Sequence, residues 1–277
     1  MRAAMLLLGL LASALCAAAP PERIAVISAP VAEILFALGL GERIVALRGY
    51  VDHIPGAERV PRMRDGGPVL RSAEPVLAFR PHALWYSEGQ VQPEVLAQLR
   101  AVGLALRAFP ERFDEDALLA TVAELGAEFG KREEAEAVAA QFRAEMEAIR
   151  RLPRLEPPPR ALFVLAGGNR PQLIAGRDSL FTALIEMAGG LHPAEHEGYK
   201  LLSPEALIKL APEIIFVIGE AIGPDGLPIV FSLPGMGQTP AGRARRFGII
   251  GGHCLGHVGL SWPACVRAVR AALLGQG

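Results

Sequence analysis

The chain has no excess of charge, little cysteine and only one long apolar run. Its 28 basic and 29 acidic side chains give a formal net charge of −1. Nucleic acids and anionic membranes attract basic surfaces, so this balance argues against either as a partner. Three cysteines among 277 residues do not make a disulfide framework, and a chain of this length buries enough apolar surface to fold without one.

Motifs that mark common enzyme classes are also absent. The sequence contains no Gly-x-Ser-x-Gly elbow, no Walker loop, no His-Glu-x-x-His motif and no dinucleotide-binding fingerprint. The nearest catalytic arrangement is a metal site built on His253 and His257, but glycines beside both histidines indicate a loop. We therefore expect a binding protein rather than an enzyme, with a metal-dependent hydrolase as the less favoured alternative.

The one long apolar run lies at the start of the chain. It covers residues 3–15, follows a basic residue and precedes a run of small residues. It is shorter than the roughly 20 residues that cross a bilayer, and Cys16 lacks the neighbours expected of a lipidation site. The pattern predicts a cleaved signal peptide over residues 1–18 and a periplasmic protein. Cys254 and Cys265 then remain, and the sequence leaves open whether they pair.

Glycine and proline are abundant, with 30 and 23 residues, and they separate short strand and helix patterns. Strand and helix alternate in the first part of the mature chain, which is typical of a parallel sheet. The alternation resumes after a proline-rich spacer. The predicted strands cover 23–28, 44–47, 83–86, 104–109, 161–165 and 214–218, and the predicted helices cover 30–38, 72–79, 93–102, 179–187 and 203–210.

A stretch without proline, from residue 114 to residue 151, separates the two alternating regions. Apolar residues recur there every three to four positions, as in an amphipathic helix. Gly126 and Gly130 allow a break into two helices, the second of which would span about 30 Å. The predicted organisation is an N-terminal lobe over 19–112, a connecting helix over 113–152 and a C-terminal lobe over 153–277.

A segment of the first lobe recurs in the second. Residues 72–86 align without gaps on residues 203–217, which lie 131 positions further along the chain. Ser, Glu and Pro coincide, and the apolar positions of the helix and the strand match. Helix–proline–strand joints are common, but this one occurs once in each half. We therefore expect an α/β protein of two similar lobes, with parallel sheets flanked by helices, a long backbone helix and a ligand cleft between the lobes.

Four segments of the chain, 30–39, 87–89, 197–207 and 233–246, carry a resemblance to a known family. They resemble the periplasmic binding proteins of ABC importers for cobalamin, siderophores and haem, and in particular the haem-binding members. The resemblance implies a monomer that captures haem in the cleft and delivers it to a permease dimer, downstream of an outer-membrane haem uptake system. A siderophore or a corrinoid is the alternative ligand.

In this family one glutamate on each lobe meets arginines of the permease. The matching positions are Glu74 and Glu205, and two carboxylates at equivalent helix starts can set the docking geometry through charge complementarity. Each is also an ordinary residue of a first helical turn, where a negative charge interacts favourably with the helix dipole. The resemblance favours docking.

The resemblance also implies an axial ligand for the haem iron, and here this chain departs from the family. Members carry a tyrosine upstream of the first-lobe glutamate, at a place where this chain has Gly67. The internal repeat offers Tyr199, six residues before Glu205, with Lys200 as a cation that favours the phenolate. A loop tyrosine that only covers the edge of the lobe is an equal alternative.

Histidines and arginines supply the other candidates. Imidazole is a common haem ligand, and the further axial candidates are His192, His257 and His53, the last of which shares a loop with Tyr50. Arginine binds carboxylates through its planar fork, which suits the haem propionates. Ordinary surface histidines and a solvated basic loop are the alternatives. The candidates for the propionates or the cleft are Arg62, Arg64, Arg71, Lys200 and Tyr86.

Aromatic residues are scarce, with 11 Phe, 3 Tyr and 2 Trp. A porphyrin would therefore be held mostly by aliphatic side chains, as apolar ligand pockets allow. We expect Trp85, Tyr86 or Trp262 at the rim of the cleft.

Overall fold

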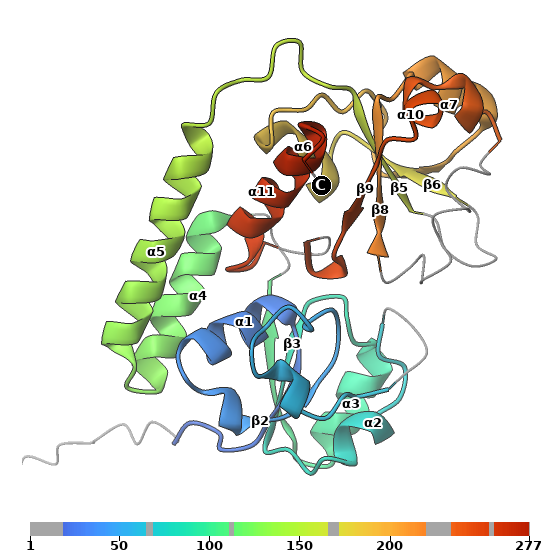
Figure 1. Ribbon diagram of the computed structural model, residues 1–277. Helices are drawn as coiled ribbons and strands as arrows, with labels where there is room; N and C mark the ends of the chain where they lie inside the picture. Colours follow the sequence, from blue (N-terminus) through green and yellow to red (C-terminus); the bar gives the residue numbers. More distant parts are fainter. Residues whose placement is uncertain are drawn as a thin grey trace, which may run out of the picture.

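The computed structural model describes residues 19–64, 69–110, 114–165, 172–219, 234–254 and 258–276. The predicted signal peptide, Gly67 and His257 lie outside these residues. Two lobes lie one above the other and are connected at one side by a pair of helices (Figure 1). Within the described residues, no helix has the length and apolar character needed to cross a membrane.

The N-terminal lobe is built on a four-stranded parallel sheet. Its elements are β1 (Ile24–Ile27), α1 (Ala29–Ala37), β2 (Ile44–Leu47), α2 (Glu74–Leu77), β3 (Ala83–Ser87), α3 (Pro93–Ala101) and β4 (Ala105–Phe109), with short 3-10 helices at Gly41–Arg43 and Ala57–Arg59. The strand order is β2-β1-β3-β4. Both β1 and β3 are buried along their whole length, as expected for parallel strands covered on both faces. The predicted strands of this lobe are confirmed, and the helix predicted over 72–79 is shorter.

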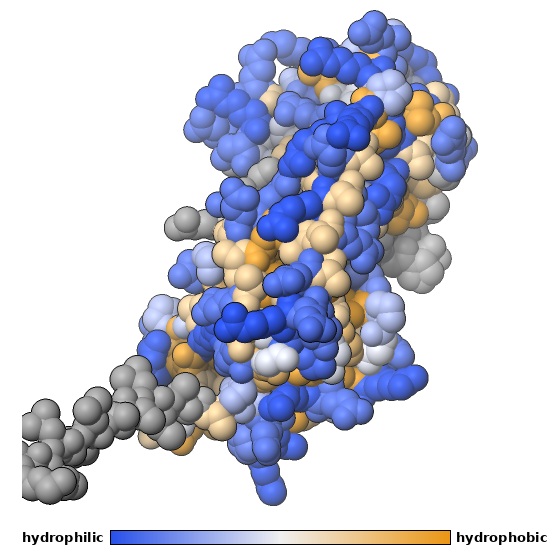
Figure 2. Space-filling model, turned by 90° about the vertical axis from the view of Figure 1, so that its left-hand side faces the viewer, coloured by the Kyte–Doolittle hydropathy of each residue, from blue (hydrophilic) through white to orange (hydrophobic). Residues whose placement is uncertain are grey.

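Two packed helices, α4 (Glu115–Glu128) and α5 (Arg132–Arg150), connect the lobes. The predicted break between them is confirmed. Gly126 lies at their contact, where a Cβ atom would overlap the side chain of Ala135, so only glycine fits. Asp114 begins α4 by accepting hydrogen bonds from two backbone N–H groups. Hydrophilic side chains cover most of the outer face of this helix pair (Figure 2).

The C-terminal lobe contains a five-stranded mixed sheet. Its elements are β5 (Ala161–Leu165), β6 (Leu173–Ala175), α6 (Leu180–Met187), β7 (Tyr199–Leu201), α7 (Pro204–Leu210), β8 (Ile214–Ile218), α10 (Pro240–Ala244), β9 (Phe247–Ile250) and α11 (Trp262–Leu273), with 3-10 helices at Met236–Gln238 and Gly252–Cys254. The order is β7-β6-β5-β8-β9. Strands β5, β8 and β9 are parallel, whereas β6 and β7 pair antiparallel. The expectation of a parallel sheet therefore holds for three of these five strands.

The internal repeat extends to the backbone conformation of the two lobes. Arg80 and Ala211, 131 positions apart, lie in the turns that follow the equivalent helices α2 and α7 and have positive φ angles of 47° and 45°. An arginine before the first strand of each lobe stabilises this turn. Arg23 donates to the carbonyl oxygen of Phe79 at 2.6 Å, and Arg160 donates to that of Leu210 at 2.7 Å. The two lobes thus share a repeated helix–turn–strand unit with the same hydrogen bond.

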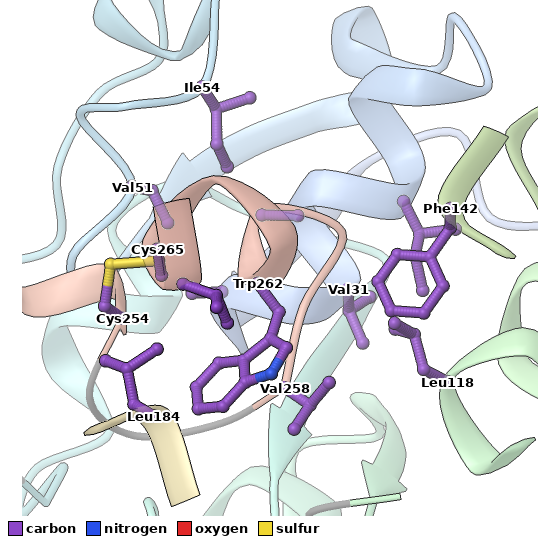
Figure 3. Packing of buried hydrophobic residues seen from close by; sticks show 14 of the residues in the cluster. Val31, Val51, Ile54, Leu118, Phe142, Leu184, Cys254, Val258, Trp262 and Cys265 are labelled. Atoms are coloured by element: carbon purple, nitrogen blue, oxygen red, sulfur yellow. A yellow bond between two sulfur atoms is a disulfide. The ribbon is translucent and has the colours of Figure 1, made fainter. Parts of the chain in front are cut away.

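One apolar core extends across both lobes and the connecting helices (Figure 3). Val31 of α1, Leu118 of α4 and Phe142 of α5 belong to the same cluster as Val258 and Trp262 of the C-terminal lobe. Separating the lobes would expose these side chains to water, which disfavours large lobe movements.

Candidate functional site

The carboxyl ends of the two sheets face each other across a contact that we call the interlobe seam. Residues just after β2 touch residues just after β9: the ring of Tyr50 lies against Gly252, and the ring of His53 stacks on that of His253 with centroids 3.9 Å apart. In open α/β sheets, ligands bind outside the carboxyl ends of the strands. The seam consists of Glu33, Tyr50 and His53 from the N-terminal lobe and Gly252, His253 and Ser261 from the C-terminal lobe.

Glu33 is the charged centre of the seam. It lies in the apolar helix α1 and is only 6% exposed. Its carboxylate accepts hydrogen bonds from Nε2 of His53 at 2.7 Å, from the backbone N–H of Ser261 at 2.9 Å and from the Ser261 hydroxyl at 2.7 Å. Because Ser261 directly precedes α11, the carboxylate also lies at the N-terminus of a helix in the opposite lobe. Donors from both lobes thus compensate the buried charge.

Glycines let the two lobes approach closely at the seam. A Cβ atom on Gly252 would come within 2.5 Å of Cγ of Tyr50, and one on Gly259 would overlap the carboxylate of Glu33. Side chains at these two positions would push the lobes apart. The glycine-rich segment after β9 is therefore explained by packing between the lobes.

A disulfide bond joins Cys254 to Cys265. It ties the 3-10 helix that carries His253 to α11, which begins beside Glu33. A ring nitrogen of His253 and the two sulfur atoms lie within 4.8 Å of one another, as in a metal site. In the oxidised protein, however, both sulfur atoms are bonded to each other, so a structural link takes the place of the thiolates that a metal would need.

Arginines gather at the carboxyl edge of the N-terminal sheet. The backbone of Arg62 forms an isolated β-bridge with Leu47, the last residue of β2. Its side chain donates a hydrogen bond from Nη2 to Oδ1 of Asp52 at 2.5 Å. Arg64 and Arg71 are exposed on the same connection, and Arg48 is buried directly after β2. The structure thus places Arg62, Arg64 and Arg71 on the connection at this edge, together with Arg48, which sequence reasoning missed. Their contact with haem propionates stays a prediction.

Exposed apolar side chains lie at the carboxyl edge of the C-terminal sheet. Leu201 is 69% exposed. It pairs with Leu173, and Leu173 pairs with Leu165, the last residue of β5, so Leu201 lies at this edge. Ile249 is 53% exposed and precedes the last residue of β9. A pocket of about 380 Å³ is lined by Glu33, His53 and Ser261 of the seam, together with Phe36, Ile54 and Leu260. A smaller pocket of about 40 Å³, lined by Ser28, Ser87 and other residues, has room for a few water molecules.

The structure alters the environment assumed for Tyr199. This residue begins β7, opposite Ala175, at the end of the strand away from the carboxyl edge. Lys200 is its neighbour in an extended strand, so the two side chains point to opposite faces of the sheet. Partial burial and the nearby Asp178 carboxylate raise the pKa of Tyr199. The prediction that Lys200 favours a phenolate here is therefore wrong, and the role of Tyr199 as a ligand stays a prediction without this support.

His192 does not reach the seam either. Its neighbour Leu191 bridges Arg160 at the amino end of β5, which is the opposite end of the sheet. His192 is 7% exposed, and burial together with the nearby His196 lowers its pKa to about 4. The expectation that His192 lines the cleft is wrong, because the loop that carries it crosses the amino edge of the sheet.

The aromatic residues expected at the rim are core residues. Trp85 and Tyr86 are buried in β3, and Trp262 is buried at the start of α11. Because both faces of the N-terminal sheet are covered, every side chain of β3 is enclosed. The rim prediction is therefore wrong for all three, including Tyr86 as a cleft residue.

The two glutamates predicted to dock the permease are exposed, one on each lobe. Glu74 begins α2 and Glu205 lies in the first turn of α7, and a serine oxygen accepts a backbone hydrogen bond at each helix start. Helices α2 and α7 lie on the side of the molecule away from α5 (Figure 1). Their docking role stays a prediction.

The sequence did not reveal that Glu33 forms the centre of the seam. A signal was present, because a charge within the apolar helix of residues 30–38 needs a buried partner. Its partner Ser261, however, lies 228 positions away along the chain. Among the predicted ligands within the described residues, His53 lies in the seam, whereas Tyr199 and His192 do not.

Comparisons with known proteins agree with this architecture. A family model described as periplasmic binding protein matches residues 24–251. The vitamin B12-binding protein of Yersinia pestis (strain Pestoides F) is 26% identical over 220 residues, which cover 78% of this chain and 75% of the relative.

Solved structures of similar proteins cover nearly the whole chain. The periplasmic heme-binding protein RhuT from Roseiflexus sp. RS-1 is 29% identical with a TM-score of 0.80, over 92% of this chain and 100% of that chain. A periplasmic heme-binding protein from Pseudomonas aeruginosa is 27% identical with a TM-score of 0.80, over 93% and 94%. Since the family model matches most of the chain and these structures share its two-lobed fold, the protein belongs to the periplasmic binding protein family, of the type that includes heme- and vitamin B12-binding members.

Proposed function

We propose that this protein captures haem between its lobes in the periplasm and delivers it to the permease of an ABC transporter. The observation that carries the proposal is the contrast between the two facing edges. Arginines gather on the N-terminal edge, whereas the exposed Ile249 and Leu201 lie on the C-terminal edge. Haem combines a flat apolar ring with two carboxylates, so it needs both apolar contacts and cations.

The related proteins support this ligand. Structures at 27% and 29% identity are those of heme-binding proteins, and a further one at 29% identity, BhuT, holds two hemes. Glu74 and Glu205, exposed on the two lobes, are the proposed contacts with the two halves of the permease. The predicted signal peptide would direct export to the periplasm, and the proposed role includes no chemical conversion of the ligand.

Vitamin B12 is the second candidate, because a vitamin B12-binding protein is 26% identical to the chain. Cobalamin carries neutral amide groups around its ring instead of carboxylates, so the cluster of arginines favours haem. A siderophore is a weaker candidate, since an anionic chelate would not use the exposed apolar residues.

A titration of the mature protein with hemin tests the proposal. The proposal predicts a saturable change of the Soret band near stoichiometric hemin. Ile249→Asp, which places a charge on the apolar edge, should weaken binding, whereas Val102→Asp, an exposed site just after α3, should leave it unchanged. An absent or non-saturable Soret change would contradict the proposal.

A further inference from the structure

We propose that Tyr50 is the axial ligand of the haem iron, an inference that rests on the proposed function. The chain has three tyrosines. Tyr86 is buried inside β3, and Tyr199 begins β7 away from the carboxyl edge. Of the three, Tyr50 is the one that is exposed and lies in a loop after the carboxyl end of a strand, three residues past β2 and at the seam between the lobes.

The structure positions Tyr50 and still leaves it accessible. Its ring lies over the backbone of Gly252, where a Cβ atom would come within 2.5 Å of the ring. Three residues later, the loop is anchored by His53, which donates to Glu33 and stacks on His253. Tyr50 is nevertheless 44% exposed. A ligand for a captured metal needs this combination of fixed orientation and open access.

The surroundings of Tyr50 suit ferric iron and the propionates of haem. Tyrosine is an established haem ligand in proteins. On binding, a bond forms between the Tyr50 oxygen and iron(III), the phenolic proton passes to water, and iron releases a bound water or chloride without a change of oxidation state. Arg48 and Arg62, the latter paired with Asp52, flank the same loop and supply guanidinium groups for the propionates of haem.

The test compares two porphyrins, ferric hemin and metal-free protoporphyrin IX, on the full mature protein. Tyr50→Phe keeps the ring on Gly252 and removes only the oxygen. It should weaken hemin at least about tenfold, as loss of a metal ligand does, and leave the affinity for protoporphyrin IX unchanged. Tyr199→Phe tests the other exposed tyrosine as the rival ligand, and if Tyr50 is the ligand it should change neither affinity. Tyr50→His offers an imidazole instead and should restore hemin binding with an altered visible spectrum.

The outcomes separate this inference from the proposed function. Unchanged hemin affinity in Tyr50→Phe overturns the inference, and so does an equal loss of both porphyrins, because packing alone would then explain the effect. A loss of hemin affinity in Tyr199→Phe instead would also overturn it. Wild-type protein that binds neither porphyrin contradicts the proposed function itself.

Discussion

Replacing Glu33 by alanine should destabilise the protein strongly, because this residue holds the two lobes together. The change removes three hydrogen bonds to a carboxylate that is 6% exposed, two of them from Ser261 in the opposite lobe. Each buried partner left unsatisfied costs about 1–3 kcal/mol. With three partners affected, we expect the free energy of unfolding to fall by about 3 kcal/mol or more. Glu33→Gln keeps the shape and part of the hydrogen bonding, so its loss should be smaller.

Denaturant unfolding followed by circular dichroism measures this effect. The matched control is Glu58→Ala on the same lobe, because Glu58 pairs with Arg59 at 3.6 Å while its side chain is 67% exposed. Such a surface pair contributes about 0–1 kcal/mol. If Glu33→Ala is no more destabilising than Glu58→Ala, the seam does not hold the lobes together and the reasoning is refuted.

Two further predictions concern the C-terminal lobe. Burial lowers the pKa of His192 to about 4, so below pH 6.5 this histidine binds a proton in the unfolded chain more readily than in the folded protein. The free energy of unfolding should therefore fall by about 3 kcal/mol between pH 7 and pH 4. In thermal unfolding, His192→Leu should remove this part of the pH dependence. Breaking the bond between Cys254 and Cys265, which closes a loop with a separation of 11 residues, should cost about 2–3 kcal/mol. The free energy of unfolding of the Cys254→Ser/Cys265→Ser variant should then be the same with and without a reductant, whereas that of the wild type should fall when a reductant is added. If the reductant changes both proteins equally, the disulfide does not stabilise the lobe.

Regular strands and helices could be predicted because local patterns specify them. The apolar strands β1, β3, β5 and β8 are continuous hydrophobic runs between turn residues, as buried parallel strands require. Strands β6 and β7 have three residues each and are defined by their neighbours rather than by their own sequence. Their antiparallel pairing could not be read from so short a pattern.

The candidate site was harder to predict because it depends on register and on long-range contacts. Glu33 lies within an apolar helix, but nothing in the sequence connects it to Ser261. Tyr199 was assigned by analogy with a loop of the first lobe, whereas its register in β7 separates its side chain from Lys200. The position of His53 in the loop after β2 could be predicted because that strand is well defined, and its role as a ligand stays a prediction.

A competition between hemin and cobalamin shows whether the facing edges of the lobes select haem. The mature protein is saturated with hemin and then titrated with excess cyanocobalamin while the Soret band is recorded. We expect the bound spectrum to persist, because the arginines interact with propionates that cobalamin lacks. Displacement of hemin by an equal or lower concentration of cobalamin would contradict it.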